Sequence, residues 1–196
     1  MQNTGLIRPT GLLLLFSLWC CSTSTWAQEL PINTQLGGNF SLTSAQNKQF
    51  ELNALKNQVI LLTFGFTHCV HSCPFVLSKY TQLLKTLGAQ AQEVKLLFIT
   101  VNPEQDTPAH LQHFLANFDA RIIGLTGSPA QLKQIAHQYG AVFTPSAHPT
   151  QTPHKTDDIP HTDRIYLLDQ QHRIRMIYPL DTAAERIQAD IKALLR

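Results

Sequence analysis

The chain has 196 residues, of which 43% are hydrophobic and 14% are charged, and its formal net charge is +2. This composition is typical of a globular domain, because disordered chains combine few hydrophobic residues with a high net charge. The sequence holds no run of basic residues, so nothing in it indicates a nucleic-acid partner or a strong affinity for a membrane surface.

The first residues have the features of a secretory signal peptide. Arg8 precedes an apolar run at 12–19, which is too short for a membrane-spanning helix of roughly 20 residues. Thr25-Trp26-Ala27 then resembles a cleavage signal. We therefore predict a signal peptide over residues 1–27 and one exported, periplasmic domain over residues 28–196.

The four cysteines fall into two pairs. Cys20 and Cys21 lie in the leader, where they allow an alternative: an uncleaved anchor or a lipoprotein that tethers the domain to the membrane. Cleavage leaves Cys69 and Cys73 in an exported chain, outside the reducing cytosol. A disulfide between them would close a very short loop and stabilise the fold little, so a chemical use of the pair is favoured over a structural staple.

Apolar alternation, continuous apolar runs and helical periodicity predict the secondary structure. In chain order, the predicted elements are a hairpin (37–42 and 49–52), a buried strand (59–66), a helix (74–87), a strand (94–101), a helix (108–118), a short strand (121–125), a helix (129–139), a proline-rich polar loop (144–160), a hairpin (164–169 and 173–178) and a last helix after 181–182. This order predicts an α/β, thioredoxin-like fold with an N-terminal β-hairpin and a long loop before a C-terminal hairpin. A loop of that length inside a compact domain is more often functional or mobile.

Three helix starts can be predicted from capping residues. Asp106 or Thr107 precedes a proline at the first helical position, and Ser128 repeats that arrangement. Asp181-Thr182 is expected to cap the last helix.

The two cysteines of the mature chain lie where the buried strand meets the first long helix. Pro74 suits a first helical turn, which places Cys73 at or just before the helix N-terminus. The positive end of the helix dipole stabilises an anion there, so we expect the pKa of Cys73 to be lowered. Two thiolates can bind a soft metal ion or exchange disulfides, and the spacing alone leaves both uses open.

Five stretches resemble the Sco/SenC family, in matching order along the whole mature chain. They are Gly65-Phe66-Thr67-His68-Cys69-x-x-x-Cys73-Pro74 and the stretches 38–42, 101–107, 124–127 and 161–169. The resemblance implies a thioredoxin-like domain that binds copper, as Cu(I) or Cu(II), through Cys69, Cys73 and His161. It also implies a partner, the copper subunit of cytochrome c oxidase or another periplasmic copper protein, to which the family delivers copper or whose cysteines it reduces.

The chain departs from the usual family pattern at two places. The family loop usually reads Cys-Pro-Asp-Val-Cys, whereas Val70, His71 and Ser72 stand between the cysteines here, and Asn102 replaces a frequent aspartate. Loss of the loop proline allows a looser loop, and His71 offers a possible fourth ligand. Both departures bear on metal affinity and client choice, and neither removes a ligand.

The implied ligand set suits copper. Two thiolates are preferred by Cu(I), and an added imidazole makes the site acceptable to Cu(II). Zinc is a weaker choice, because structural zinc sites normally have four ligands. His68 and His71 are expected to be exposed loop residues, and His148 and His154 to be accessory ligands at most. The other histidines are expected on solvated faces: His110, His113, His137 and His172. Asp169 is expected to be a hairpin residue rather than an acid catalyst.

Other functions use the same residues. The main alternative is a periplasmic thiol-disulfide oxidoreductase that acts through Cys69 and Cys73, with copper incidental. Peroxidase activity is less favoured, because no separate resolving cysteine remains after processing. A sensor of copper or redox state would share every residue named above.

Overall fold

The computed structural model describes residues 29–69, 72–144 and 159–196. The predicted leader, His71 of the cysteine loop, and His148 and His154 of the proline-rich loop lie outside the described residues. Among the described residues, no helix combines the length and the apolar character needed to span a membrane.

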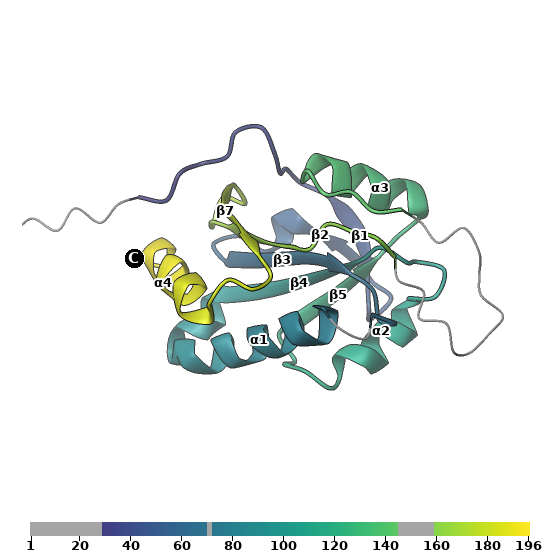
Figure 1. Ribbon diagram of the computed structural model, residues 1–196, viewed down its shortest axis with the longest axis horizontal. Helices are drawn as coiled ribbons and strands as arrows, with labels where there is room; N and C mark the ends of the chain where they lie inside the picture. The colour runs from purple at the N-terminus through teal and green to yellow at the C-terminus, as the bar shows by residue number, and fades with distance from the viewer. Residues whose placement is uncertain (1–28, 70–71, 145–158) are drawn as a thin grey trace, which may run out of the picture.

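Seven strands form one sheet in the order β2-β1-β5-β4-β3-β6-β7 (Figure 1). The elements are β1 Ser41–Ser44, β2 Gln49–Glu51, η1 Leu52–Ala54, β3 Val59–Gly65, α1 Ser72–Leu87, η2 Gly88–Glu93, β4 Val94–Thr100, α2 Pro108–Leu115, β5 Ile122–Thr126, α3 Pro129–Gln138, β6 Arg164–Leu168, β7 Ile174–Pro179 and α4 Ala184–Leu194. The three central strands β3, β4 and β5 are parallel, and β6 and β7 add an antiparallel hairpin beside β3. The predicted order of elements and both hairpins are confirmed.

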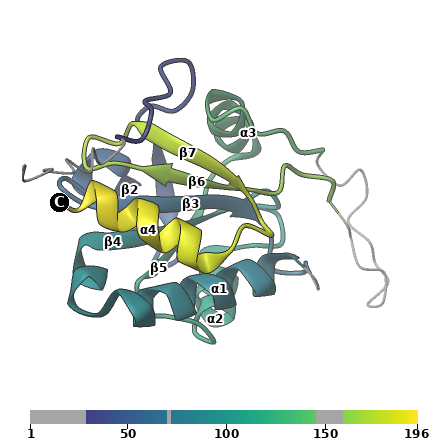
Figure 2. The same cartoon turned by 60° about the vertical axis from the view of Figure 1, so that its left-hand side comes forward.

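Strand β3 lies at the centre of a three-layer arrangement. All seven of its residues are buried, as its continuous apolar sequence predicts. Leu61 packs with α1, α2 and α4 on one face of the sheet, whereas Ile60 and Leu62 pack with α3 and the N-terminal segment on the other. Figures 1 and 2 show these helices on opposite sides of the sheet.

Helix α1 is held to the sheet by an apolar stripe at helical spacing. The stripe is buried throughout and consists of Val76, Leu77, Tyr80, Leu83, Leu84 and Leu87. The helix begins at Ser72, two residues before the predicted start. Cys73 therefore lies inside the first helical turn rather than ahead of it.

Two of the three predicted caps are confirmed. Thr107 caps α2 by accepting the backbone N–H of His110 at 3.3 Å, and Pro108 follows it. Ser128 and Gln131 form a capping box at the start of α3.

The prediction that Asp181-Thr182 caps α4 is wrong. Ala183 is the N-cap residue, and it makes no side-chain cap. The segment before α4 is held instead by Lys79 of α1, whose ammonium donates to the carbonyl oxygen of Thr182 at 2.8 Å. A contact from another helix thus replaces the local cap.

Asp169 organises the turn between β6 and β7. Its side chain is 1% exposed and accepts hydrogen bonds from Arg173 at 2.8 Å and Arg175 at 3.1 Å. Burial would raise the pKa of this carboxyl, but the hydrogen bonds from the two arginines and from the turn backbone hold the pKa below its ordinary value. Asp169 is therefore a structural residue of the hairpin, as predicted.

Candidate metal centre

The two cysteines are in contact at the carboxyl end of β3. The backbone N–H of Cys73 points to the sulfur of Cys69 at 3.4 Å, and that sulfur lies 3.2 Å from the hydroxyl oxygen of Ser72. Cys73 is buried, Cys69 is half-buried, and no disulfide joins them. The start of α1 thus holds both sulfur atoms in one place.

The pKa of Cys73 is raised, so the expectation of a lowered pKa is wrong. The main cause is the hydrogen bond with Cys69, followed by burial and by the charge of Cys69. Hydrogen bonds with the Phe66 backbone and Ser72 oppose this rise without cancelling it. Since both thiols share one site, ionisation of one disfavours ionisation of the other. The helix terminus is the weaker effect here.

Gly65 makes room for the buried thiol. A Cβ atom at this position would lie 2.6 Å from the Cys73 sulfur and 2.8 Å from the Phe98 ring. Contacts this short do not occur between real side chains, so a larger residue would displace the sulfur or the ring. Gly65 belongs to the stretch 65–74 that resembles the Sco/SenC family, and the structure shows that its lack of a side chain leaves space for the Cys73 sulfur.

His161 lies beside the cysteine loop. Strands β3 and β6 are antiparallel with Thr63 opposite Ile165, so the residues that precede β6 lie near those that follow β3. The Phe66 ring meets the imidazole edge-on, with ring centroids 5.6 Å apart. Phe66 also accepts the backbone N–H of Cys69 at 3.3 Å, so one residue connects the histidine to the loop.

A short backbone ladder fixes the strand segment around His161. Phe143 and His161 form an antiparallel bridge. The N–H of Thr144 donates to Pro160 at 3.0 Å, and the N–H of Thr162 donates to Val142 at 2.9 Å. The two ends of the segment 145–158 are therefore adjacent.

One nitrogen of the buried imidazole of His161 is available to a ligand. Nδ1 lies 2.7 Å from the carbonyl oxygen of Ile159. A carbonyl only accepts, so Nδ1 carries the proton and Nε2 of the neutral ring has a lone pair. Nε2 is buried without a hydrogen bond of good geometry, and Oδ1 of Asp163 lies 3.1 Å away, a contact that becomes an ion pair when the ring is protonated. A buried nitrogen in this state is unusual and is the state a metal ligand needs.

A second group of ligand-type side chains lies close to the cysteines. His68, Asp106 and His110 bring three ligand atoms within 4.8 Å of one another, the one such group among the described residues. The donor atoms of Cys69, Cys73 and His161 accordingly do not all lie that close together. His110 is exposed as predicted, but its proximity to His68 and Asp106 was missed.

The remaining histidines behave largely as predicted. His113 and His137 are exposed on their helices. His172 is half-buried, and its Nε2 lies 3.1 Å from the carbonyl oxygen of Leu55.

The SCO1/SenC family profile matches residues 28–196. The copper-bound structure of ScoI from Bradyrhizobium japonicum is 34% identical with a TM-score of 0.72, and the match covers 82% of this chain and 99% of that chain. Copper-bound yeast Sco1 is 29% identical with a TM-score of 0.70, over 81% and 89% of the two chains. The SCO2-like protein of Rickettsia felis is 29% identical over 160 residues, which are 82% of this chain and 77% of that protein. These similarities confirm the thioredoxin-like fold, and the chain belongs to the SCO1/SenC family.

Proposed function

We propose that this protein is an exported copper-binding assembly protein that holds copper through Cys69, Cys73 and His161. Its client is the binuclear copper centre of cytochrome c oxidase or another periplasmic copper protein, which it loads with copper or whose cysteines it reduces. The observation that carries the proposal is the buried imidazole of His161, which packs against Phe66 at the same end of the sheet as the cysteine pair. The copper-bound relatives support the choice of metal.

The donor set fits copper in both oxidation states. Two neighbouring cysteine sulfurs suit Cu(I), and an imidazole added to them makes the site acceptable to Cu(II). Copper supplies a soft cation that binds the thiolates and releases their protons. Bound copper would replace the hydrogen bond between the thiols and offset the charge repulsion, both of which raise the pKa of Cys73.

The protein residues have distinct parts in holding the ion. The carbonyl oxygen of Ile159 accepts a hydrogen bond from Nδ1–H of His161, which leaves the lone pair of the neutral ring on Nε2. Phe66 packs against the ring and shields it from water. Gly65 leaves the space that Cys73 fills.

Substitution of His161 tests the proposal. The reduced chain is titrated with buffered Cu(I) and, separately, with Cu(II), and thiolate-to-Cu(II) charge-transfer absorption is recorded. His161→Ala should weaken Cu(II) binding at the thiol site by about tenfold or more and reduce this absorption, because it removes a direct ligand. His137→Ala, an exposed histidine on α3, is the matched control and should bind as the parent does.

Unchanged absorption and affinity in His161→Ala would remove the histidine from the ligand set. Absence of copper binding by the reduced parent chain would contradict the function itself.

The contact between the two sulfurs also favours the second candidate, a thiol-disulfide oxidoreductase. Cysteines held this close, with the Cys73 N–H 3.4 Å from the Cys69 sulfur, can form a disulfide by exchange with a disulfide substrate. In that case His161→Ala should leave the rate of thiol exchange with a disulfide substrate unchanged. Cys73→Ser should abolish it.

A further inference from the structure

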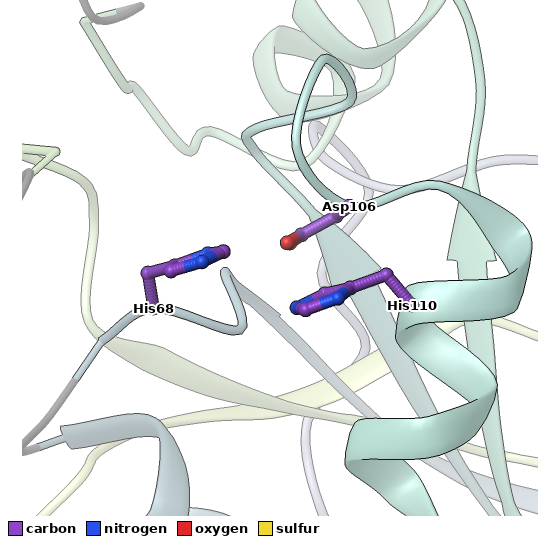
Figure 3. A group of neighbouring side chains, drawn as sticks. All are labelled: His68, Asp106 and His110. Atoms are coloured by element: carbon purple, nitrogen blue, oxygen red, sulfur yellow. The ribbon is translucent and has the colours of Figure 1, made fainter. Parts of the chain in front are cut away.

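Three side chains from different segments meet beside the cysteine loop. His68 follows β3, Asp106 precedes α2, and His110 lies in the first turn of α2. Figure 3 shows the two imidazoles pointing toward one another, with a carboxylate oxygen of Asp106 beside the gap between them. The three ligand atoms lie within 4.8 Å of one another.

Asp106 is a fixed and buried carboxylate. It is 0% exposed, and its oxygens accept hydrogen bonds from the Thr100 hydroxyl at 2.6 Å, the Thr67 N–H at 3.1 Å and the Thr67 hydroxyl at 2.5 Å. In the part of the chain that the structure describes, no lysine or arginine forms an ion pair with it. Burying a carboxylate without a cation is costly, so the site favours a positive ligand.

The carboxylate retains one acceptor position. Two of the three hydrogen bonds go to Oδ2, and Oδ1 receives the remaining one from the Thr67 hydroxyl. A carboxylate oxygen can accept two bonds, so Oδ1 has one lone pair left.

The hydrogen bonds also select the tautomer of His68. The Thr67 hydroxyl gives its proton to Asp106 at 2.5 Å and lies 3.2 Å from Nδ1 of His68. It therefore accepts from Nδ1–H, which leaves Nε2 of His68 with a lone pair. A metal-binding histidine normally has its other nitrogen fixed by such a hydrogen bond.

His110 reaches the same place from the helix. Thr107 caps α2 and accepts the backbone N–H of His110, which fixes the turn that carries it. The rings of His68 and His110 are nearly parallel, at 4°, with centroids 5.2 Å apart, and both are exposed to solvent. An ion can therefore enter from the surface.

We propose that His68, Asp106 and His110 form a second metal site, for a divalent transition ion such as Cu²⁺ or Zn²⁺. Two imidazole nitrogens and one carboxylate oxygen suit these ions, whereas Cu⁺ prefers sulfur. Three protein ligands leave further positions open to water. The chain then has a sulfur-rich site and a nitrogen–oxygen site at one end of the sheet.

The test is made in the full chain with both cysteines replaced, Cys69→Ser/Cys73→Ser, so that thiolates contribute nothing. This background is titrated with Cu²⁺ alone, followed by calorimetry and by electron paramagnetic resonance. We expect one Cu²⁺ per chain, with nitrogen hyperfine structure and no sulfur charge-transfer band.

Adding His110→Ala to that background should weaken Cu²⁺ binding by about tenfold or more, because a direct ligand is lost. His113→Ala is the matched control, an exposed histidine one turn along the same helix. It should leave the affinity unchanged.

The proposal is overturned if the cysteine-free background binds no Cu²⁺, or if His110→Ala binds it as tightly as that background. Loss of binding with His161→Ala but not with His110→Ala would assign the ion to the first site. These outcomes are independent of copper binding by the thiols, which the reduced parent chain reports separately.

Discussion

Asp106 and Asp169 are both buried carboxylates, but the regions around them balance the charge differently. In the β6–β7 turn, Asp169 is paired with the guanidinium groups of Arg173 and Arg175. In the loop before α2, Asp106 is held by hydroxyl and backbone donors, without a described lysine or arginine. A neutralised carboxylate is a structural element, whereas one bound by neutral donors still attracts a cation.

The largest effect expected from this comparison is on stability. Asp169→Asn should lower the free energy of unfolding by about 3 kcal/mol, because it leaves Arg175, with a side chain 10% exposed, without its buried partner. Denaturant unfolding of the metal-free chain measures this loss. The control is Asp119→Asn, which breaks a more exposed ion pair with Arg121 and should cost under about 1 kcal/mol. An equal decrease in the free energy of unfolding of the two variants would contradict the idea that burial makes the Asp169 ion pairs more important for stability.

Asp106→Asn should have a smaller effect and lower the free energy of unfolding of the metal-free chain by about 1 kcal/mol. The hydroxyls of Thr67 and Thr100 can rotate to accept from an amide, which arginines cannot do. Zn²⁺ at a hundred times its dissociation constant should stabilise the parent by about 2.7 kcal/mol. Asp106→Asn should lose this stabilisation. Thermal unfolding with and without Zn²⁺, in the cysteine-free background, measures both. Equal stabilisation of parent and variant by Zn²⁺ would mean that Asp106 is no ligand.

The smallest expected effect is the pH dependence of the stability that Asp169 contributes. The pKa of Asp169 is lower in the folded chain than its ordinary value of 3.8, so the stability it supplies is present above about pH 4 and is lost as the pH falls through the folded value. The stability difference between the parent and Asp169→Asn should therefore narrow below pH 4. Unfolding curves at pH 7, 4 and 3 test this, and a difference that stays constant across them would contradict the role given to the charge.

Much of the fold could be predicted because its signals are local. The stripe of α1, the continuous apolar run of β3 and the Ser128 cap each lie within a few residues of one another. The start of α4 could not be predicted, since Lys79 holds it from a hundred residues earlier. Long-range contacts of this kind leave no mark in a local pattern.

In the candidate site, too, local features could be predicted from the sequence and long-range contacts could not. Its cysteines stand out by their spacing, and His161 required the family resemblance. The pKa of Cys73 was predicted in the wrong direction, because contact with Cys69 and burial outweigh the helix terminus. His68 and Asp106 follow adjacent parallel strands, β3 and β4, whose carboxyl ends meet at one edge. The adjacency of these two strand ends is the sequence signal for the second cluster.

The backbone hydrogen bonds around His161 determine how well the chain tolerates insertions and deletions in residues 145–158. Val142 pairs with Thr162 and Thr144 with Pro160, so the described residues on either side of 145–158 are neighbours. Each doubling of such a closed segment adds only about 0.6 kcal/mol of closure entropy. Insertions or deletions between these anchor points should therefore leave the histidine in register with the cysteines, which allows this part of the surface to diverge while the proposed copper ligands stay in place.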